Sequence, residues 1–136
     1  MLLNNSLSET VVQNPREGYP SISVTELLSE VRLDASKGNE LLASNIEAAM
    51  DTVNNQLIGK HYLVAPLTVD QTRFYKRAVC NEAAAVIAED NKDFDTSSTG
   101  QIRGENGLDK VTSLRRNVNY AIADLTNRKR NRVRLL

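Results

Sequence analysis

The sequence predicts an all-α fold, a small bundle of about four helices. Apolar residues recur at spacings of three and four in several segments, helix-capping patterns precede two of these segments, and no segment alternates convincingly enough to predict a strand. The chain has 136 residues, the size of one domain, and with only 4% aromatic residues its core must be aliphatic. We expect an N-terminal arm at 1–20, a helical domain at 21–127 and a basic C-terminal arm at 128–136.

The N-terminal arm is expected to be extended. It is polar, contains Pro15, Gly18 and Pro20, and shows no helical or alternating apolar period beyond a small patch at Val11 and Val12. Two interpretations remain open for it. It is either a disordered tail or a segment that becomes ordered on a neighbouring subunit.

A first, short helix is predicted to begin at a capping box. Ser23 can accept a bond from a backbone amide of the first turn, while Glu26, three residues later, reaches back to the cap. Ile22 and Leu27 flank this start as a hydrophobic staple, and the turn-forming residues 34–38 close the helix.

A long amphipathic helix is predicted from about Asn39, and Gly59 is well placed to end it because glycine readily adopts the left-handed conformation at a helix C-terminus. Its apolar face consists of Leu42, Ile46, Ala49, Val53 and Leu57.

A third helix is predicted to follow a second capping box, formed by Thr68 and Gln71, and to run to about Asp90. The three consecutive alanines at 83–85 would let another helix approach it closely, because the alanine side chain is small.

Residues 93–106 are rich in Asp, Ser, Thr and Gly, so we expect a solvated loop there, followed by a last helix at about 108–126. Asp93 and Asp95 flank Phe94 in this loop. Their spacing does not match a calcium-binding loop, so a role in capping or turn formation is expected.

No enzymatic activity, cofactor or metal is predicted. The common signatures of phosphate binding, acyl transfer and zinc hydrolysis are all missing from the sequence. His61 stands in a polar loop and is expected at a surface or interface, while Cys80, the single cysteine, is expected to be a buried small side chain rather than a reactive thiol. No apolar run approaches the length needed to cross a bilayer, and a soluble protein in a reducing compartment is expected.

The charge is distributed unevenly along the chain. The whole sequence has 17 basic and 17 acidic residues, but from Arg115 to Leu136 there are seven basic residues and one acidic residue, Asp124. Three interpretations of the C-terminal arm remain open: a solvated tail, a nonspecific contact with DNA phosphates, and docking on a protein, which the two final leucines favour. The residues predicted to dock are Arg128, Lys129, Arg130, Arg132, Arg134, Leu135 and Leu136.

The second half of the sequence resembles the tailed-phage head completion proteins of the gpL-like type. The resemblance comprises a Tyr-x-Arg-Ala-Val helix start, an alanine-rich run, a Lys-Asp-Phe-Asp-Thr turn that ends in glycine, an Arg-Arg-Asn helix and an Ala-Ile-Ala-Asp-Leu segment before the basic arm. In this chain these features are at residues 75–79, 83–88, 92–100, 115–117 and 121–125. A weaker similarity extends back to about Tyr19.

The resemblance implies a structural component of a virion, located at the neck between head and tail and assembled in the host cytoplasm. Such proteins are all-α adaptors that form a ring, twelve-fold if it follows the portal protein, and that extend the DNA channel and offer a surface to the next neck or tail-terminator protein. The implied partners are the portal protein, neighbouring copies and, nonspecifically, the genomic DNA. No membrane is implied.

Two groups of residues are assigned to these contacts. The basic arm, 128–136, is expected to bind the portal. The contact between subunits is expected to involve Arg73, Arg77, Asp93, Phe94 and Asp95. The alternative that we retain is a small helical DNA-binding protein that holds duplex through its basic C-terminus.

Overall fold

The computed structural model describes residues 10–31, 38–60, 66–93 and 98–126. In chain order the elements are β1 (Val11–Val12), β2 (Ile22–Ser23), α2 (Val24–Glu30), α3 (Asn39–Lys60), α4 (Val69–Asp93) and α5 (Ser98–Leu125). The predicted all-α class is confirmed, since helices make up most of the described chain and the two strands form only a small antiparallel ladder.

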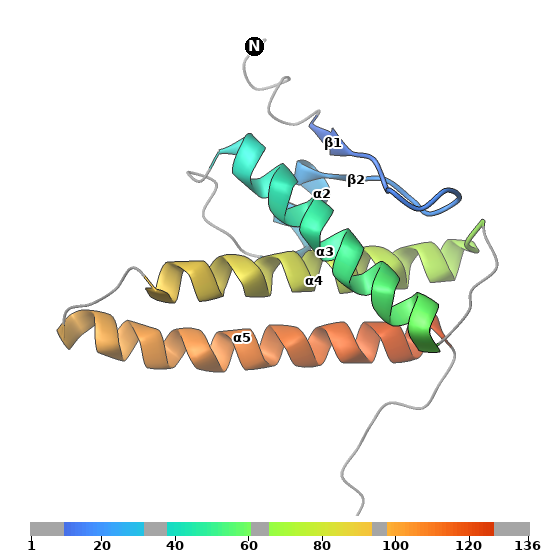
Figure 1. The fold of residues 1–136 in the computed structure, drawn as a ribbon. Coiled ribbons are helices and arrows are strands. Elements are labelled where there is room, and N and C mark those ends of the chain that lie inside the picture. Colours follow the sequence, from blue (N-terminus) through green and yellow to red (C-terminus); the bar gives the residue numbers. More distant parts are fainter. Residues whose placement is uncertain (1–9, 32–37, 61–65, 94–97, 127–136) are drawn as a thin grey trace, which may run out of the picture.

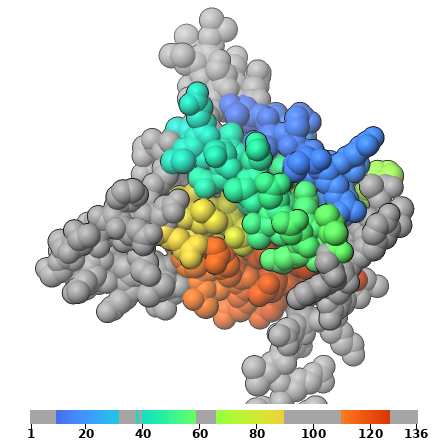
Figure 2. All heavy atoms as spheres, in the orientation of Figure 1, coloured from blue at the N-terminus to red at the C-terminus, as the bar shows by residue number. Residues whose placement is uncertain are grey.

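The two longest helices, α4 and α5, run antiparallel to each other, and α3 crosses over the pair at an angle (Figure 1). The short helix α2 packs against both α3 and α4. In the space-filling view α3 occupies the middle of the visible face, between the N-terminal segment and α5 (Figure 2).

The core is formed by the apolar faces that the sequence predicts. Most of its members are aliphatic, and the residues on the predicted face of α3 are all 1% exposed or less. A smaller cluster of Ala84, Ala85, Val111 and Leu114 packs α4 against α5, as expected for the three consecutive alanines. The main cluster includes Ile22, Leu27, Ile46, Met50, Val53, Leu57, Tyr75, Val79, Ile87, Val118 and Leu125.

Both predicted capping boxes are confirmed. The Ser23 hydroxyl accepts a bond from the Glu26 backbone amide at 3.1 Å, and the Glu26 carboxylate accepts one from the Ser23 amide at 3.0 Å. At the start of α4 the Thr68 hydroxyl accepts from the Gln71 amide at 3.1 Å, and the Gln71 side chain accepts from the Thr68 amide at 2.9 Å. Each box satisfies backbone amides that have no partner within the helix.

Residues 10–20 differ from the arm that the sequence suggests. They lie on the domain, where Val12 and Tyr19 are each 7% exposed within the main core. Val11 pairs with Ser23 and Val12 with Ile22 in an antiparallel ladder. Strands of two residues are too short to show an alternating pattern, so this pairing has no signal in the sequence.

The last helix begins about ten residues before the predicted start, at Ser98 rather than near Leu108, so most of the expected loop is helical backbone. Glycine costs about 1 kcal/mol per residue in a helix relative to alanine, and Gly100, Gly104 and Gly107 therefore argued against a helix here. Extending a helix that is already nucleated adds a hydrogen bond with each residue, and packing against a neighbouring helix routinely overrides propensity.

The other helix ends lie close to their predicted positions. Helix α3 runs to Lys60, so Gly59 lies in its last turn rather than after its end. Helix α4 runs to Asp93, three residues past the predicted end.

Candidate interaction surface

The first part of the candidate surface is a pair of arginines held on one aromatic ring. Arg73 and Arg77, both predicted to lie at a contact between subunits, are one helical turn apart on α4. Their guanidinium carbons lie 5.0 and 5.9 Å from the centroid of the Phe74 ring. A cation over an aromatic face is attracted by the ring quadrupole, so Phe74 holds both guanidiniums near one position on the surface.

Among the described residues, Arg73 and Arg77 engage few acidic groups. Arg73 lies 3.4 Å from Asp70, but the two side chains are 59% and 73% exposed, so this ion pair contributes little stability. Arg77 forms no ion pair with any described residue. Val69, one turn before Arg73, is 85% exposed. The start of α4 therefore presents an apolar side chain and two cations along one line.

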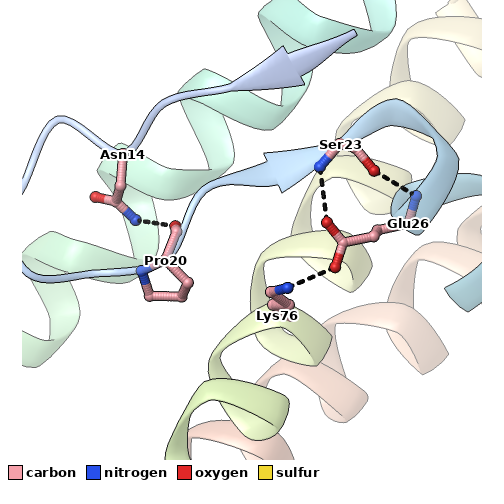
Figure 3. A network of polar contacts seen from close by, with 5 residues as sticks. All are labelled: Asn14, Pro20, Ser23, Glu26 and Lys76. Atoms are coloured by element: carbon pink, nitrogen blue, oxygen red, sulfur yellow. Dashed lines mark hydrogen bonds and ion pairs between the residues drawn. The ribbon is translucent and has the colours of Figure 1, made fainter. Parts of the chain in front are cut away.

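Lys76, between the two arginines in sequence, has an internal partner instead. Its ammonium group lies 2.6 Å from a carboxylate oxygen of Glu26, whose other oxygen caps α2 through Ser23 (Figure 3). Burial alone would raise the pKa of Glu26, but the hydrogen bonds from Lys76 and Ser23 outweigh it and lower the pKa below its ordinary value. Lys76 thus ties α4 to α2 and is not part of the arginine pair.

A groove of about 310 Å³ lies beside Arg77, between α2, α4 and α5. Its lining is polar and carries both signs of charge, with Glu30 and Asp124 as acids and Arg77 as the base. The remaining lining residues are Asn81, Asn117, Tyr120 and Ala121. Amide, phenol and carboxylate groups at a concave surface suit a polar peptide segment better than an apolar ligand.

A partly buried charge cluster joins α4 to α5 farther along the same pair of helices. Arg115 on α5 lies 2.7 Å from Glu89 and 3.3 Å from Glu82, and the Glu82 side chain is only 8% exposed. Burial raises the pKa of Glu82, and the charge of Arg115 offsets part of that rise. The cluster fixes the two helices relative to each other.

A closed ring of hydrogen bonds attaches the N-terminal segment to α3 and α4. The Asn14 amide donates to the Tyr75 hydroxyl at 2.7 Å, Tyr75 donates to the Asn54 carbonyl oxygen at 2.6 Å, and the Asn54 amide donates to the Asn14 carbonyl oxygen at 3.1 Å. Asn14 also donates to the backbone carbonyl of Pro20 (Figure 3). Burial raises the pKa of Tyr75 to about 12, so its hydroxyl remains a donor at physiological pH.

Cys80 is 1% exposed, as predicted, and burial, with smaller contributions from the charges of Glu30 and Glu26, raises its pKa to about 12. Its thiol stays protonated at neutral pH and is inert as a nucleophile. Over the described ranges no group of three or more His, Cys, Asp or Glu residues is placed to hold a metal ion. Nor is any helix in that part of the chain long and apolar enough to span a bilayer.

The remaining predicted site residues are only partly covered. Asp93 is the last residue of α4, and only its backbone is described. Phe94, Asp95, His61 and the basic arm at 128–136 lie outside the described residues. Arg73 and Arg77 are the predicted site residues that the structure brings together.

Sequence reasoning missed the charge cluster and the hydrogen-bond ring. Glu82 and Glu89 are seven residues apart and so share a helix face, which was a usable signal for a common partner. The hydrogen bonds among Asn14, Asn54 and Tyr75 had no such signal, since they connect three segments that are distant in sequence.

The described residues form a small helical domain with charged side chains along its helix faces and beside a polar groove. The chain belongs to the phage head completion protein (GPL) family, whose model matches residues 68–136, just over half of the sequence. No curated protein and no solved structure is significantly similar to the chain.

The matched region contains α4, α5 and the basic arm, which is the region on which the resemblance was based. Membership in this family gives the protein a structural role in phage head completion, as a component of the virion that interacts with other head or tail components.

Proposed function

We propose that this protein is an adaptor at the junction of phage head and tail. Copies of it form a ring, twelve-fold if it follows the portal, beneath the portal vertex. The ring extends the DNA channel, helps to retain the packaged genome without reading its sequence, and offers its distal face to a neck or tail-terminator protein. It assembles in the host cytoplasm and has no catalytic role.

The observation that carries the proposal is the family match over 68–136, because it includes the basic arm together with the helix pair from which the arm emerges. In this proposal Arg128 to Arg134 meet acidic groups at the rim of a portal pocket, and Leu135 and Leu136 fill the pocket. Deeply buried anchors surrounded by a polar rim are the usual arrangement of an interface hot spot.

Deleting residues 128–136 tests this assignment. The truncated protein is expected to lose portal binding in a co-sedimentation assay while keeping its circular dichroism spectrum, because every described helix ends before residue 128. A companion variant, Leu135→Ala with Leu136→Ala, keeps every charge and is expected to weaken binding at least tenfold if the leucines are the anchor. Undiminished attachment of the truncated protein would contradict the proposal.

The same proteins distinguish the alternative of a DNA-binding protein. A connector is expected to ignore free duplex at physiological salt, whereas a protein that holds DNA through five basic residues in its tail would bind it with a steep salt dependence. Tight, salt-sensitive binding of free duplex without portal binding would favour that alternative.

A further inference from the structure

We propose that the exposed face of α3 docks on the arginine pair of α4 in a second copy of this chain. The inference rests on the proposed ring and identifies two surfaces for its subunit contact. The α3 face consists of Glu40, Glu47, Asp51 and Ile58, and the α4 ridge consists of Val69, Arg73 and Arg77.

The α3 face is a continuous line of exposed side chains. Its members are separated by seven, four and seven residues, spacings close to whole turns at about 3.6 residues per turn, so they stand above one another along roughly 27 Å of helix. All are exposed, and Ile58 is 60% exposed. No Lys or Arg occurs from Asn39 to Gly59, so no cation from α3 itself compensates these acids before its last residue.

The opposite side of the same helix is the core face, whose apolar residues are fully buried. Helix α3 is therefore fixed to the domain along one side and displays the acidic line on the other. In Figure 2, α3 forms the middle of the visible surface, where nothing among the described residues covers it. An exposed isoleucine in line with three acids is typical of a helix face that another element covers.

The α4 ridge has the complementary chemistry. Val69, Arg73 and Arg77 follow each other at intervals of four residues, and the two guanidiniums are held against Phe74 at 5.0 and 5.9 Å. Because the ring restrains both side chains, less conformational entropy is lost when they bind a carboxylate. The N-terminal end of a helix also carries a partial positive charge, which adds to the attraction for acids.

The two surfaces match in spacing as well as in charge. Glu47 with Asp51, and Arg73 with Arg77, are both i,i+4 pairs, whose Cβ atoms are separated by about 6 Å. Ile58 lies beyond Asp51 toward the end of α3, and Val69 lies before Arg73 at the start of α4. An antiparallel arrangement of the helices therefore places the two acids against the two arginines. It also brings Ile58 to the Val69 end of the ridge, about 4.5 Å beyond Val69 along the helix axis, because seven residues separate Asp51 from Ile58 and four separate Val69 from Arg73.

A second copy is the occupant that these features favour. Both surfaces are on the same chain, so each copy can bind one neighbour through its α3 face and another through its α4 ridge. A contact between two different patches is heterologous, and repeated heterologous contacts form a ring when the rotation closes. Nucleic acid is a poor occupant of the α3 face because the three carboxylates repel phosphates.

Charge reversal tests the pairing. One variant carries Glu47→Lys with Asp51→Lys, and the other carries Arg73→Glu with Arg77→Glu. Each is expected to self-associate at least tenfold more weakly than the wild type in sedimentation velocity at low salt. An equal mixture of the two variants is expected to recover association. The new lysines on α3 of one variant then face the new glutamates on α4 of the other, and the unchanged acids of the second face the unchanged arginines of the first.

Two single reversals outside these surfaces serve as controls. Glu17→Lys, at an exposed position of the N-terminal segment, and Lys110→Glu, at an exposed position of α5, are expected to leave association unchanged. Circular dichroism of every variant separates lost contact from lost fold. A wild-type protein that stays monomeric at low salt, reversed variants that associate normally, or a mixture that fails to recover would each contradict the pairing.

Portal binding is measured on the same proteins with the basic arm intact. If the reversed variants still associate but the arm deletion abolishes portal binding, this pairing is wrong and the adaptor function stands. If association follows the charge swap but no variant or wild type binds the portal, the pairing stands and the adaptor function is wrong.

Discussion

Glu26 combines two roles in one side chain. One carboxylate oxygen caps α2 through the Ser23 amide, and the other pairs with Lys76 of α4 at 2.6 Å (Figure 3). The pair is partly exposed, with side-chain exposures of 31% for Lys76 and 40% for Glu26, so solvent screens much of its strength. Glu26 is nonetheless the residue through which the start of α2 is joined to α4.

The ion pair makes stability depend on pH in a defined direction. The folded-state pKa of Glu26 is lowered, so its contribution is present above the unfolded value of about 4.5 and is lost as the pH falls through the folded value. Glu26→Gln keeps a capping acceptor but removes the charge, and we expect the free energy of unfolding to drop by about 0.2–1 kcal/mol at pH 7. Urea denaturation of the variant and the wild type at pH 7 and pH 3 measures this difference in the free energy of unfolding.

The difference between Glu26→Gln and wild type should be smaller at pH 3 than at pH 7, because the wild-type carboxyl loses its charge as the pH falls through the folded-state pKa. Glu47→Gln, on the exposed face of α3, is the matched control and should change little at either pH. An equal loss at both pH values would mean that the amide disturbs the capping box rather than the ion pair.

At the scale of elements, the length of α5 is the clearest departure from local propensity. The three glycines between Ser98 and Leu108 predict a loop, yet the backbone is helical from Ser98. The regular part of the helix, with Val111, Leu114, Val118 and Leu125 buried along one side, supplies the nucleus from which these turns extend.

Proline substitution distinguishes helix from loop in this region. Asn106→Pro removes a backbone donor in the interior of α5 and clashes with the preceding turn, so we expect a loss of about 3 kcal/mol in the free energy of unfolding. Thr99→Pro, in the first turn of α5, is the control and should be tolerated because that amide has no partner within the helix. Urea denaturation of both variants provides the comparison.

If residues 98–107 were a solvated loop, Asn106→Pro would cost no more than Thr99→Pro. Amide hydrogen exchange provides an independent measure, since helical amides of this segment should exchange more slowly than those of an open loop.

At the scale of the whole molecule, the N-terminal segment is part of the domain. Residues 10–20 contribute two buried side chains to the core, and Asn14 joins the segment to α3 and α4 through Asn54 and Tyr75. Tyr19 also packs edge-to-face on Tyr75, with ring centroids 5.3 Å apart. These contacts cross three regions of the sequence and fasten the start of the chain to its centre.

Deleting residues 1–20 is therefore expected to destabilise the protein strongly. The loss of the buried Val12 and Tyr19 side chains corresponds to about 3 kcal/mol or more, and the deletion also leaves Tyr75 and Asn54 without Asn14. Deleting residues 1–9 removes none of the described contacts and serves as the control. Thermal denaturation of the two truncated proteins measures the difference, and equal melting temperatures would show that residues 10–20 contribute nothing to the fold.

Much of this protein could be predicted from its sequence because the information is local. The apolar residues of α3 recur at spacings of three and four, and each capping box lies within four consecutive residues. The family could be recognised for the same reason, since its motifs are short sequence segments between residues 75 and 125. Cys80 could be assigned to the core because a single cysteine on a helix is by default a small buried side chain.

The tertiary structure decided what depends on contacts between distant residues. Val12 and Tyr19 are buried because they pack into the core cluster with side chains of α3 and α4. Those side chains are distant in sequence, so the residues near Val12 and Tyr19 do not indicate their burial. The helical start of α5 likewise opposes its own glycine-rich composition. The sequence alone determined the number of helices and most of their extent, the absence of familiar catalytic motifs and the family, because periodicity and motifs extend over a few residues. Only the fold could pair Lys76 with Glu26, because the two residues lie on different helices and meet only when α2 packs against α4.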